Sequence, residues 1–593
     1  MPLLSEQLNG EMTVVLLYIV RILFSTPLYL LPEAFSLSFL AILALSFEIS
    51  ADDASNSLSH YFRTSLVLPA FAIVTVPKLK VFWPGASSGI FLGAVTVPGL
   101  LVSRLIQTLR AESLQEVGIE EFEYLKLQYW AAAASCLAVL FFLFNTRQRR
   151  GKSTSSNCCL SKWSSIYCFI CMILLVGLSL VSLSGKLYGG LSLALMSLWV
   201  LLHGLAAVTL IQKILHMFPA CVSIGESLLV TTGLVIYFGD MATYTAANIS
   251  YMASSNVLFV QNGFKRSEIS TVIQGMIFGL LLFPLFYKYV LRMWQYLVRL
   301  LSIQDLGNNA IRRALVFYAS VTFMLVVVVP SWMQFVHAFH VHPLLCSFMR
   351  LTSLMPDQIL QNNVPLWVFD FVLSEPLKRL TLCTYWLVII SVSVRRFYNI
   401  SKNSKTERIL LRKYYHLMAV SIFVPALIFQ PKFLDLAFGA ALAVFLLLEI
   451  IRIWKIWPLG HLVHQFMNAF TDHRDSDLLV ISHFSLLLGC AIPIWLSPGF
   501  TDRPLAPFAG ILSLGIGDTM ASMVGHKYGV LRWSKTGKKT VEGTAAGITS
   551  VLAACFVLLP LLAATGYIFT MALDFFDCSS DHQRPVGGLY GTA

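Results

Sequence analysis

The chain has 593 residues, of which 57% are hydrophobic and only 12% are charged, and its mean hydropathy is +0.74. Soluble globular proteins carry about 45–50% apolar and about 25% charged residues, so this composition excludes a soluble enzyme, a disordered scaffold and a nucleic-acid-binding protein. The net charge of +12, from 42 Lys+Arg against 30 Asp+Glu, is expected in the loops of a membrane protein, where basic residues set the topology.

Apolar runs long enough to cross a bilayer recur along the chain. At about 20 residues per span, they predict an all-α, polytopic integral membrane protein with roughly 13–16 transmembrane helices. Residues 1–394 form the expected N-terminal multi-helix membrane region. The clearest runs are Trp130–Phe144, Ser165–Leu183, Leu191–Leu210, Val272–Val290, Ala314–Val329 and Leu380–Val394.

After residue 394, four further apolar runs form two pairs, each closed by a short turn. The first pair is joined at Gln430-Pro431-Lys432 and the second around Ser497-Pro498-Gly499. Each pair returns the chain to its starting side, so three polar segments share one side of the membrane. Their basic residues place that side in the cytoplasm by the positive-inside rule. The runs are Tyr414–Phe429, Leu434–Ile451, Leu478–Leu496 and Leu505–Met523, and the polar segments are Arg395–Lys413, Arg452–Asp477 and His526–Glu542.

The segment from Gly515 to Gly547 combines seven glycines, five basic residues and two acids. Glycine lets the backbone approach an anion closely, and lysine neutralises phosphate as a point charge. Lys538, Lys539 and Thr540 lead into an expected helix that begins near Glu542, and the N-terminus of a helix binds phosphate readily. The pattern therefore indicates a phosphate site, although it lacks the Walker sequence. The alternative is a basic loop that only orients helices.

Three carboxylates are candidates for metal binding or proton transfer. Asp518 lies in an apolar stretch, where a carboxylate is costly and points to function; the alternative is a turn or a helix cap. Asp472 and Asp475 belong to a DxxDxD cluster. Such a cluster can hold Mg²⁺ through one or two oxygens while phosphates supply further ligands, or it can be a solvated loop with internal ion pairs.

Charged residues also mark the ends of one apolar pair. Arg412, Lys413 and His416 begin the first helix of that pair. Glu449 and Arg452 end the second helix, and their i, i+3 spacing allows them to pair with each other or to anchor the helix end by snorkelling.

Taken together, GDTMAS, GHKYGVLRW and GKKTVEGTAAG resemble the signature of the CTP-dependent polyprenol kinases, which include kinases of dolichol, phytol and diacylglycerol. RKYYH, LEIIR, KIWPLGH and TDHRDSD are similar, in this order, to segments of eukaryotic dolichol kinases. The resemblance extends from about Ser404 to Gly547 and implies a kinase-like membrane domain over residues 395–550. Residues 551–593 hold a last apolar helix and a polar tail unlike the family's ending, which suggests a truncated or alternatively spliced product. Its activity would be weak or absent if the helices it lacks close the site in the family.

The resemblance implies transfer of the γ-phosphoryl group of CTP to dolichol, giving dolichyl phosphate for protein glycosylation. It places the protein in the endoplasmic reticulum membrane with the site facing the cytosol. The expected partners are CTP, dolichol or a related polyprenol, and the bilayer, with no nucleic acid. Mg²⁺ or a similar divalent cation is the expected cofactor. A kinase of another lipid alcohol and a multi-pass transporter are the alternatives, and the latter is disfavoured because no repeated halves are visible.

The same resemblance assigns the site residues. It gives catalytic roles to Asp518, Lys539 and Glu542, with Asp518 as either the metal ligand or the base that accepts the alcohol proton. Asp472 and Asp475 are the further metal candidates. The expected nucleotide-binding residues are Gly517, Gly525, Gly529, Trp533, Lys538, Lys539, Thr540, Gly543 and Thr544.

Overall fold

The computed structural model divides into two compact units, Met1–Phe264 and Lys265–Ala593, which are described separately. The predicted boundary between residues 394 and 395 stays a prediction. Apart from isolated positions between 96 and 108 and residue 339, the described residues are 119–151, 190–217, 224–252, 267–300, 309–337, 363–403, 408–468, 481–495, 504–532 and 540–567.

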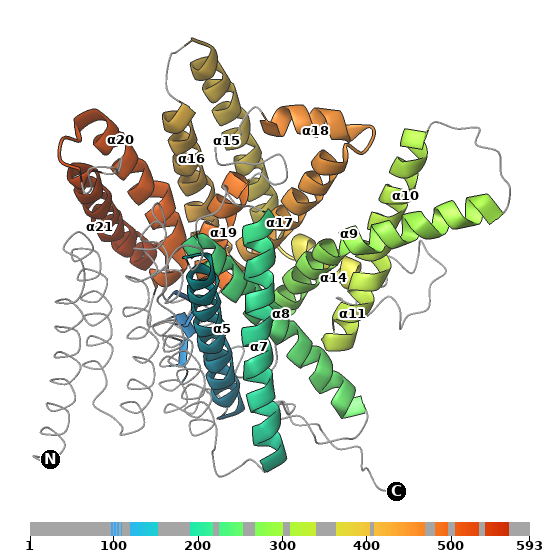
Figure 1. Cartoon of the computed structure of the whole chain (residues 1–593). Coiled ribbons are helices and arrows are strands. Elements are labelled where there is room, and N and C mark those ends of the chain that lie inside the picture. The colour runs from blue at the N-terminus through green and yellow to red at the C-terminus, as the bar shows by residue number, and fades with distance from the viewer. Residues whose placement is uncertain are drawn as a thin grey trace, which may run out of the picture. The chain divides into compact units, whose positions relative to one another are not determined.

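These residues are almost entirely helical (Figure 1), and the β-structure among them is one isolated antiparallel bridge between Arg532 and Thr540. Seven of their helices are long and apolar enough to cross a membrane, and three shorter helices are also apolar. The predicted all-α polytopic fold is therefore confirmed. The number of 13–16 spans stays a prediction, because runs such as Ser165–Leu183 lie outside the described residues.

The first unit contains three long helices, α5 (Ile119–Gly151), α7 (Gly190–Met217) and α8 (Ile224–Met252). A run of buried alanines beside Trp130 lets α5 approach its neighbours closely. The buried Asp240 accepts hydrogen bonds from Tyr124 at 2.5 Å and from Gln128 at 3.0 Å. Such pairing is what a carboxylate inside a membrane bundle requires.

The second unit contains the remaining described helices. The predicted hairpin around Pro431 is present as α16 and α17, whereas the predicted polar connection Arg395–Lys413 is largely helical, because α15 continues to Asn403 and α16 begins at Arg408. Lysine and arginine are good helix formers, so basic composition does not end a helix. The elements are α9 (Glu268–Leu300), α10 (Asn309–Phe323), η1 (Met324–Val328), α11 (Val329–Val336), α14 (Val364–Leu373), α15 (Pro376–Asn403), α16 (Arg408–Phe429), α17 (Pro431–Trp454), α18 (Leu459–Asn468), α19 (Ile481–Trp495), η2 (Ala506–Phe508), η3 (Ile511–Gly517), α20 (Asp518–Tyr528) and α21 (Val541–Ala564).

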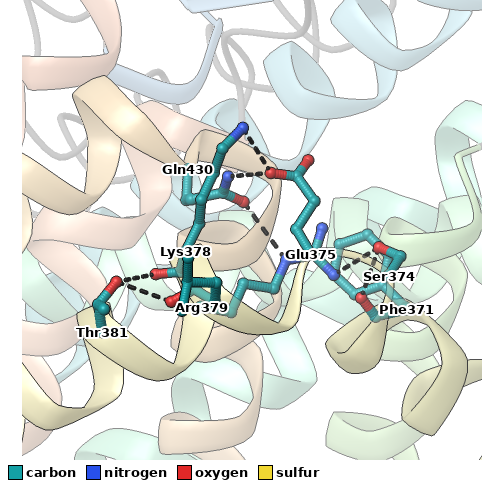
Figure 2. A network of polar contacts seen from close by, with 8 residues as sticks. Phe371, Ser374, Glu375, Lys378, Arg379, Thr381 and Gln430 are labelled. Atoms are coloured by element: carbon teal, nitrogen blue, oxygen red, sulfur yellow. Dashed lines mark hydrogen bonds and ion pairs between the residues drawn. The ribbon is translucent and has the colours of Figure 1, made fainter.

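A polar network fastens the turn between α16 and α17 to the start of α15 (Figure 2). Gln430 donates to Glu375 at 3.0 Å and accepts from Arg379 at 3.3 Å. Arg379 is buried and also donates to Ser374 at 2.9 Å. Its guanidinium lies 4.3 Å from the ring centre of Phe371, a favourable cation–π distance. The hairpin turn is thus held by partners from outside the hairpin.

Candidate active site

Asp518 lies where a π-helix becomes an α-helix. The turn Ile511–Gly517 is π-helical, and α20 begins at Asp518 without a break in the helical run. Single π-turns inside helices occur frequently at functional sites. Asp518 therefore lies within a continuous helical run, and not in a turn or at a free helix end as the alternative interpretation of the sequence had it.

Two side chains of α16 converge on the Asp518 carboxylate. Lys413 Nζ donates to Asp518 Oδ2 in a short ion pair. His416 Nδ1 lies 3.3 Å from the same oxygen and 3.0 Å from the carbonyl oxygen of Leu514 in the π-turn. Both partners are mostly buried, whereas the Asp518 side chain is 40% exposed. Among the described contacts all partners of Asp518 address Oδ2, which leaves Oδ1 open to a ligand.

This arrangement keeps Asp518 ionised. Partial burial raises the pKa of its carboxyl group, but the hydrogen bonds and positive charge supplied by His416 and Lys413 outweigh burial and hold the pKa at about 2. Opposite charge and hydrogen bonds to the charged form both favour ionisation. Asp518 is thus a permanent anion at neutral pH, suited to a metal ion or to orienting a hydroxyl group.

The glycines predicted to cradle phosphate lie at the crossing of α20 and α21. A Cβ added to Gly543 would stand 2.6 Å from the Ala521 carbonyl oxygen and 3.0 Å from Gly525 Cα, and one added to Gly525 would stand 2.8 Å from Thr540 Oγ1. A Cβ at Gly517 would meet Val551 at 2.9 Å, and one at Gly529 would meet Thr540. These glycines let two helices touch, the use that membrane proteins make of small residues at i, i+4 spacing.

The N-terminus of α21 is closed by its own chain. As predicted, a helix begins here, with Thr540 as its N-cap. Thr540 Oγ1 accepts from the Gly543 N–H at 3.2 Å, and the Thr544 hydroxyl donates to the Thr540 carbonyl at 3.0 Å. The Val541 N–H donates to the Leu531 carbonyl at 2.8 Å. In this conformation the groups expected to bind phosphate are satisfied by capping, and their role with a nucleotide stays a prediction.

Glu542 clamps the loop that precedes α21. Its Oε1 accepts from the backbone N–H groups of Leu531 at 2.9 Å and of Val530 at 3.2 Å. Together with the bridge between Arg532 and Thr540, this clamp brings the two ends of the loop together. In this conformation the Glu542 carboxylate is engaged by backbone N–H groups, and its predicted catalytic role stays a prediction.

Trp533, Lys538 and Lys539 lie outside the described residues, as do Asp472 and Asp475. Among the residues that the structure describes, no three His, Cys, Asp or Glu side chains group together as metal ligands. The predicted metal role of Asp472 and Asp475 therefore stays a prediction, and Asp518 is the described carboxylate that could hold an ion, with phosphate oxygens as further ligands.

Two pairings extend what the sequence indicated. Glu449 and Arg452 do pair, at 2.6 and 2.9 Å, but they are almost fully buried instead of snorkelling at an interface. Lys413 and His416 were visible as charged residues at a helix start, yet their convergence on Asp518 was not. The available signal was their position on the same membrane side as the Gly515–Gly547 segment.

Comparison with known proteins gives one consistent family. The family model described as dolichol kinase matches residues 311–530. The dolichol kinase EVAN of Arabidopsis thaliana is 52% identical over 565 residues, covering 95% of this chain and 92% of the relative. The dolichol kinases of Homo sapiens and Saccharomyces cerevisiae are 38% and 32% identical over 207 and 199 residues, about a third of this chain and 38% and 36% of theirs. No solved structure matches.

Proposed function

This chain belongs to the dolichol kinase family, and from that premise we propose that it transfers the γ-phosphoryl group of CTP to the terminal hydroxyl of dolichol. The product is dolichyl phosphate, used in protein glycosylation. The reaction takes place at the cytosolic face of the endoplasmic reticulum membrane. The observation that carries the assignment is the Asp518 carboxylate, which is held by Lys413 and His416 and has one oxygen open.

Phosphoryl transfer needs positioning and charge neutralisation more than covalent chemistry, because its transition state is loose. An anion with a pKa of about 2 is a weak base, so Asp518 does not remove the alcohol proton in advance. It accepts a hydrogen bond from the hydroxyl, fixes the direction of attack, and can take the proton only late, when the oxygen has bonded to phosphorus. Lys413 and His416 fix the rotamer of Asp518 in this task.

The alternative role for the Asp518 carboxylate is to hold Mg²⁺. When bound, the ion neutralises charge on the triphosphate, and Asp518 Oδ1 would hold it together with phosphate oxygens. Asp472 and Asp475 are the further ligands we propose. Lys413 limits the negative charge of the site, so that one carboxylate can serve a metal ion without repelling the nucleotide.

Lys538 and Lys539 supply the positive charge for the triphosphate. Because the first-turn N–H groups of α21 are occupied by the Thr540 cap and by Leu531, most of the attraction must come from lysine side chains. Glu542 and the glycine crossing fix the residues on both sides of the segment that carries those lysines. Trp533 belongs to the same segment of the sequence and is proposed to contact the nucleotide.

The acceptor is a lipid, so its hydroxyl must be met at the membrane surface. Asp518 contacts the first turns of α16, near the end of the helix that begins with the basic residues Arg408 and Arg412. That end is the cytosolic one by the positive-inside rule. A soluble donor and a membrane-bound hydroxyl can therefore meet at Asp518.

Radiolabel transfer in membranes isolated from cells that express the chain tests the assignment. We expect label from [γ-³²P]CTP to appear in dolichyl phosphate, with little transfer from ATP and with less transfer to phytol or diacylglycerol. Preferred labelling of phytol or diacylglycerol would replace dolichol as the acceptor. Absence of label in any lipid, at normal protein abundance, would contradict kinase activity for this chain.

A further inference from the structure

The short helix α18 presents three chemically different sides. Gly460 and Val463 are buried against the protein. Leu459 and Leu462 are 43% and 67% exposed, whereas His461 and Gln465 are exposed polar residues. At about 100° per residue, the two leucines lie about 60° apart on one side, and His461 and Gln465 lie about 40° apart on another. On a helix whose exposed surface faces only water, a separate apolar side would be unfavourable.

The position of α18 indicates what covers this apolar side. The helix follows α17, a candidate membrane span that ends at Trp454, and it lies crosswise at the end of that span (Figure 1). Ile453 at the end of α17 and Trp457 in the connection are both exposed, so large apolar side chains are exposed along the chain between the span and α18. Tryptophan is enriched at the level of lipid headgroups.

Close contact at Gly460 fixes this crosswise orientation. The connection turns at Lys455, which has a positive φ of 49°, and the Gly460 N–H donates to the Ile456 carbonyl at 2.6 Å. A Cβ at Gly460 would lie 2.6 Å from Lys455 Cα and 2.8 Å from the Lys455 carbonyl oxygen. Only glycine lets α18 lie this close to the end of α17.

We propose that α18 is an interfacial membrane-binding helix whose apolar side, formed by Leu459 and Leu462, lies with Trp457 of the preceding connection in the boundary between headgroups and acyl chains of the bilayer. Its polar side, with His461 and Gln465, faces water. The geometry is that of an in-plane amphipathic helix, which binds lipid through buried apolar area. This binding surface does not depend on the proposed kinase reaction, and its occupant is bilayer lipid rather than a second protein.

Depth-dependent fluorescence quenching tests the proposal. A genetically encoded fluorescent amino acid replaces Leu462 in the full chain, which is reconstituted into phosphatidylcholine vesicles. The matched control carries the same amino acid in place of His461, about 100° from Leu462 around the same helix. We expect phosphatidylcholine brominated near the top of its acyl chains to quench the probe at position 462 at least two-fold more than the probe at 461. Aqueous iodide should quench the probe at 461 more than the probe at 462.

Two outcomes overturn the inference. Equal quenching by iodide at both positions would show that both sides of α18 face water. Protection of position 462 from both quenchers would show that protein, including a second copy of the chain, covers the leucines. Gly460→Ala provides a second variant: it should tilt α18 and reduce the difference between the two positions, whereas an unchanged difference would contradict the orienting role of Gly460.

Discussion

A carboxylate paired with a lysine lies near each end of α16, but the two pairs differ in origin and burial. At the Gln430 end, Glu375 and Lys378 are one helical turn apart, and their side chains are 42% and 72% exposed. At the other end, Lys413 is 13% exposed and reaches Asp518 from a different helix. Exposed local pairs contribute about 0–1 kcal/mol. The Glu375 pair is therefore part of the network that holds the α16–α17 turn against the start of α15. The Asp518 pair, by contrast, forms only because the fold brings together groups that are distant in the sequence.

This difference predicts where a neutral substitution matters most. Asp518→Asn keeps the size of the side chain but cannot bind Mg²⁺ strongly or accept a proton. We expect turnover to fall by at least about 100-fold, the lower range for loss of a general base, with protein abundance unchanged. The measurement is transfer of label from CTP to dolichol per amount of enzyme. Turnover close to that of the wild type would remove Asp518 from the reaction and direct attention to Asp472 and Asp475.

Lys413→Met tests the contribution of the lysine partner while the Asp518 carboxylate stays in place. The substitution preserves the length of the side chain and removes the charge that holds Asp518 Oδ2. A hydrogen bond to a charged group contributes about 1.5–3 kcal/mol, so we expect kcat/KM for dolichol phosphorylation to fall roughly 10- to 100-fold. Lys413→Arg should restore part of the loss. Equal activity of the Met variant and the wild type would show that the ion pair serves only packing.

The double substitution of Lys538 and Lys539 by Gln removes two charges from the expected donor loop. Two charges that each contribute up to about 1 kcal/mol predict a rise of roughly 3- to 30-fold in KM for CTP. KM for dolichol should change little, because the acceptor approaches from the bilayer. The matched control is the pair Arg395 and Arg396, exposed near the end of α15, also replaced by Gln. The same rise in both double variants would mean that general surface charge, not this loop, attracts CTP.

Glu375→Gln gives the smallest expected effect and serves as the counterpart of Asp518→Asn. It neutralises a carboxylate of similar exposure at the opposite end of α16. We expect turnover within about two-fold of the wild type and a loss of stability of no more than about 1 kcal/mol, measured by thermal unfolding in detergent. A large loss of turnover at unchanged stability would erase the distinction between the two ends.

The elements that depend on local sequence were predictable. The α16–α17 hairpin follows from two apolar runs separated by Gln430-Pro431-Lys432, and the start of α21 follows from Thr540 two residues before Glu542. Asp518 was identifiable because a carboxylate in an apolar run is costly. Each of these signals is contained within one or two helical turns.

The convergence of residues from different helices was not predictable from one sequence. Lys413 and Asp518 are 105 residues apart, and no spacing rule connects them. The glycines of the motif were interpreted as a phosphate cradle, although Gly525 and Gly529, like Gly543 and Gly547, have the i, i+4 spacing of a helix-packing face. That spacing was the available signal for the α20–α21 crossing.

Because of the π-turn at Ile511–Gly517, the number of residues in this helical run is more tightly constrained than the identity of its apolar residues. An α-helix rotates about 100° per residue, and a π-turn accommodates one residue more than an α-helical turn. Upstream, Phe508 and Ile511 are fully buried; downstream, the phase of the helix directs Asp518 towards Lys413. Apolar substitutions within the run leave that phase intact. Deletion of a single residue would rotate everything after it, so relatives that keep this site should differ here by replacement and not by insertion or deletion.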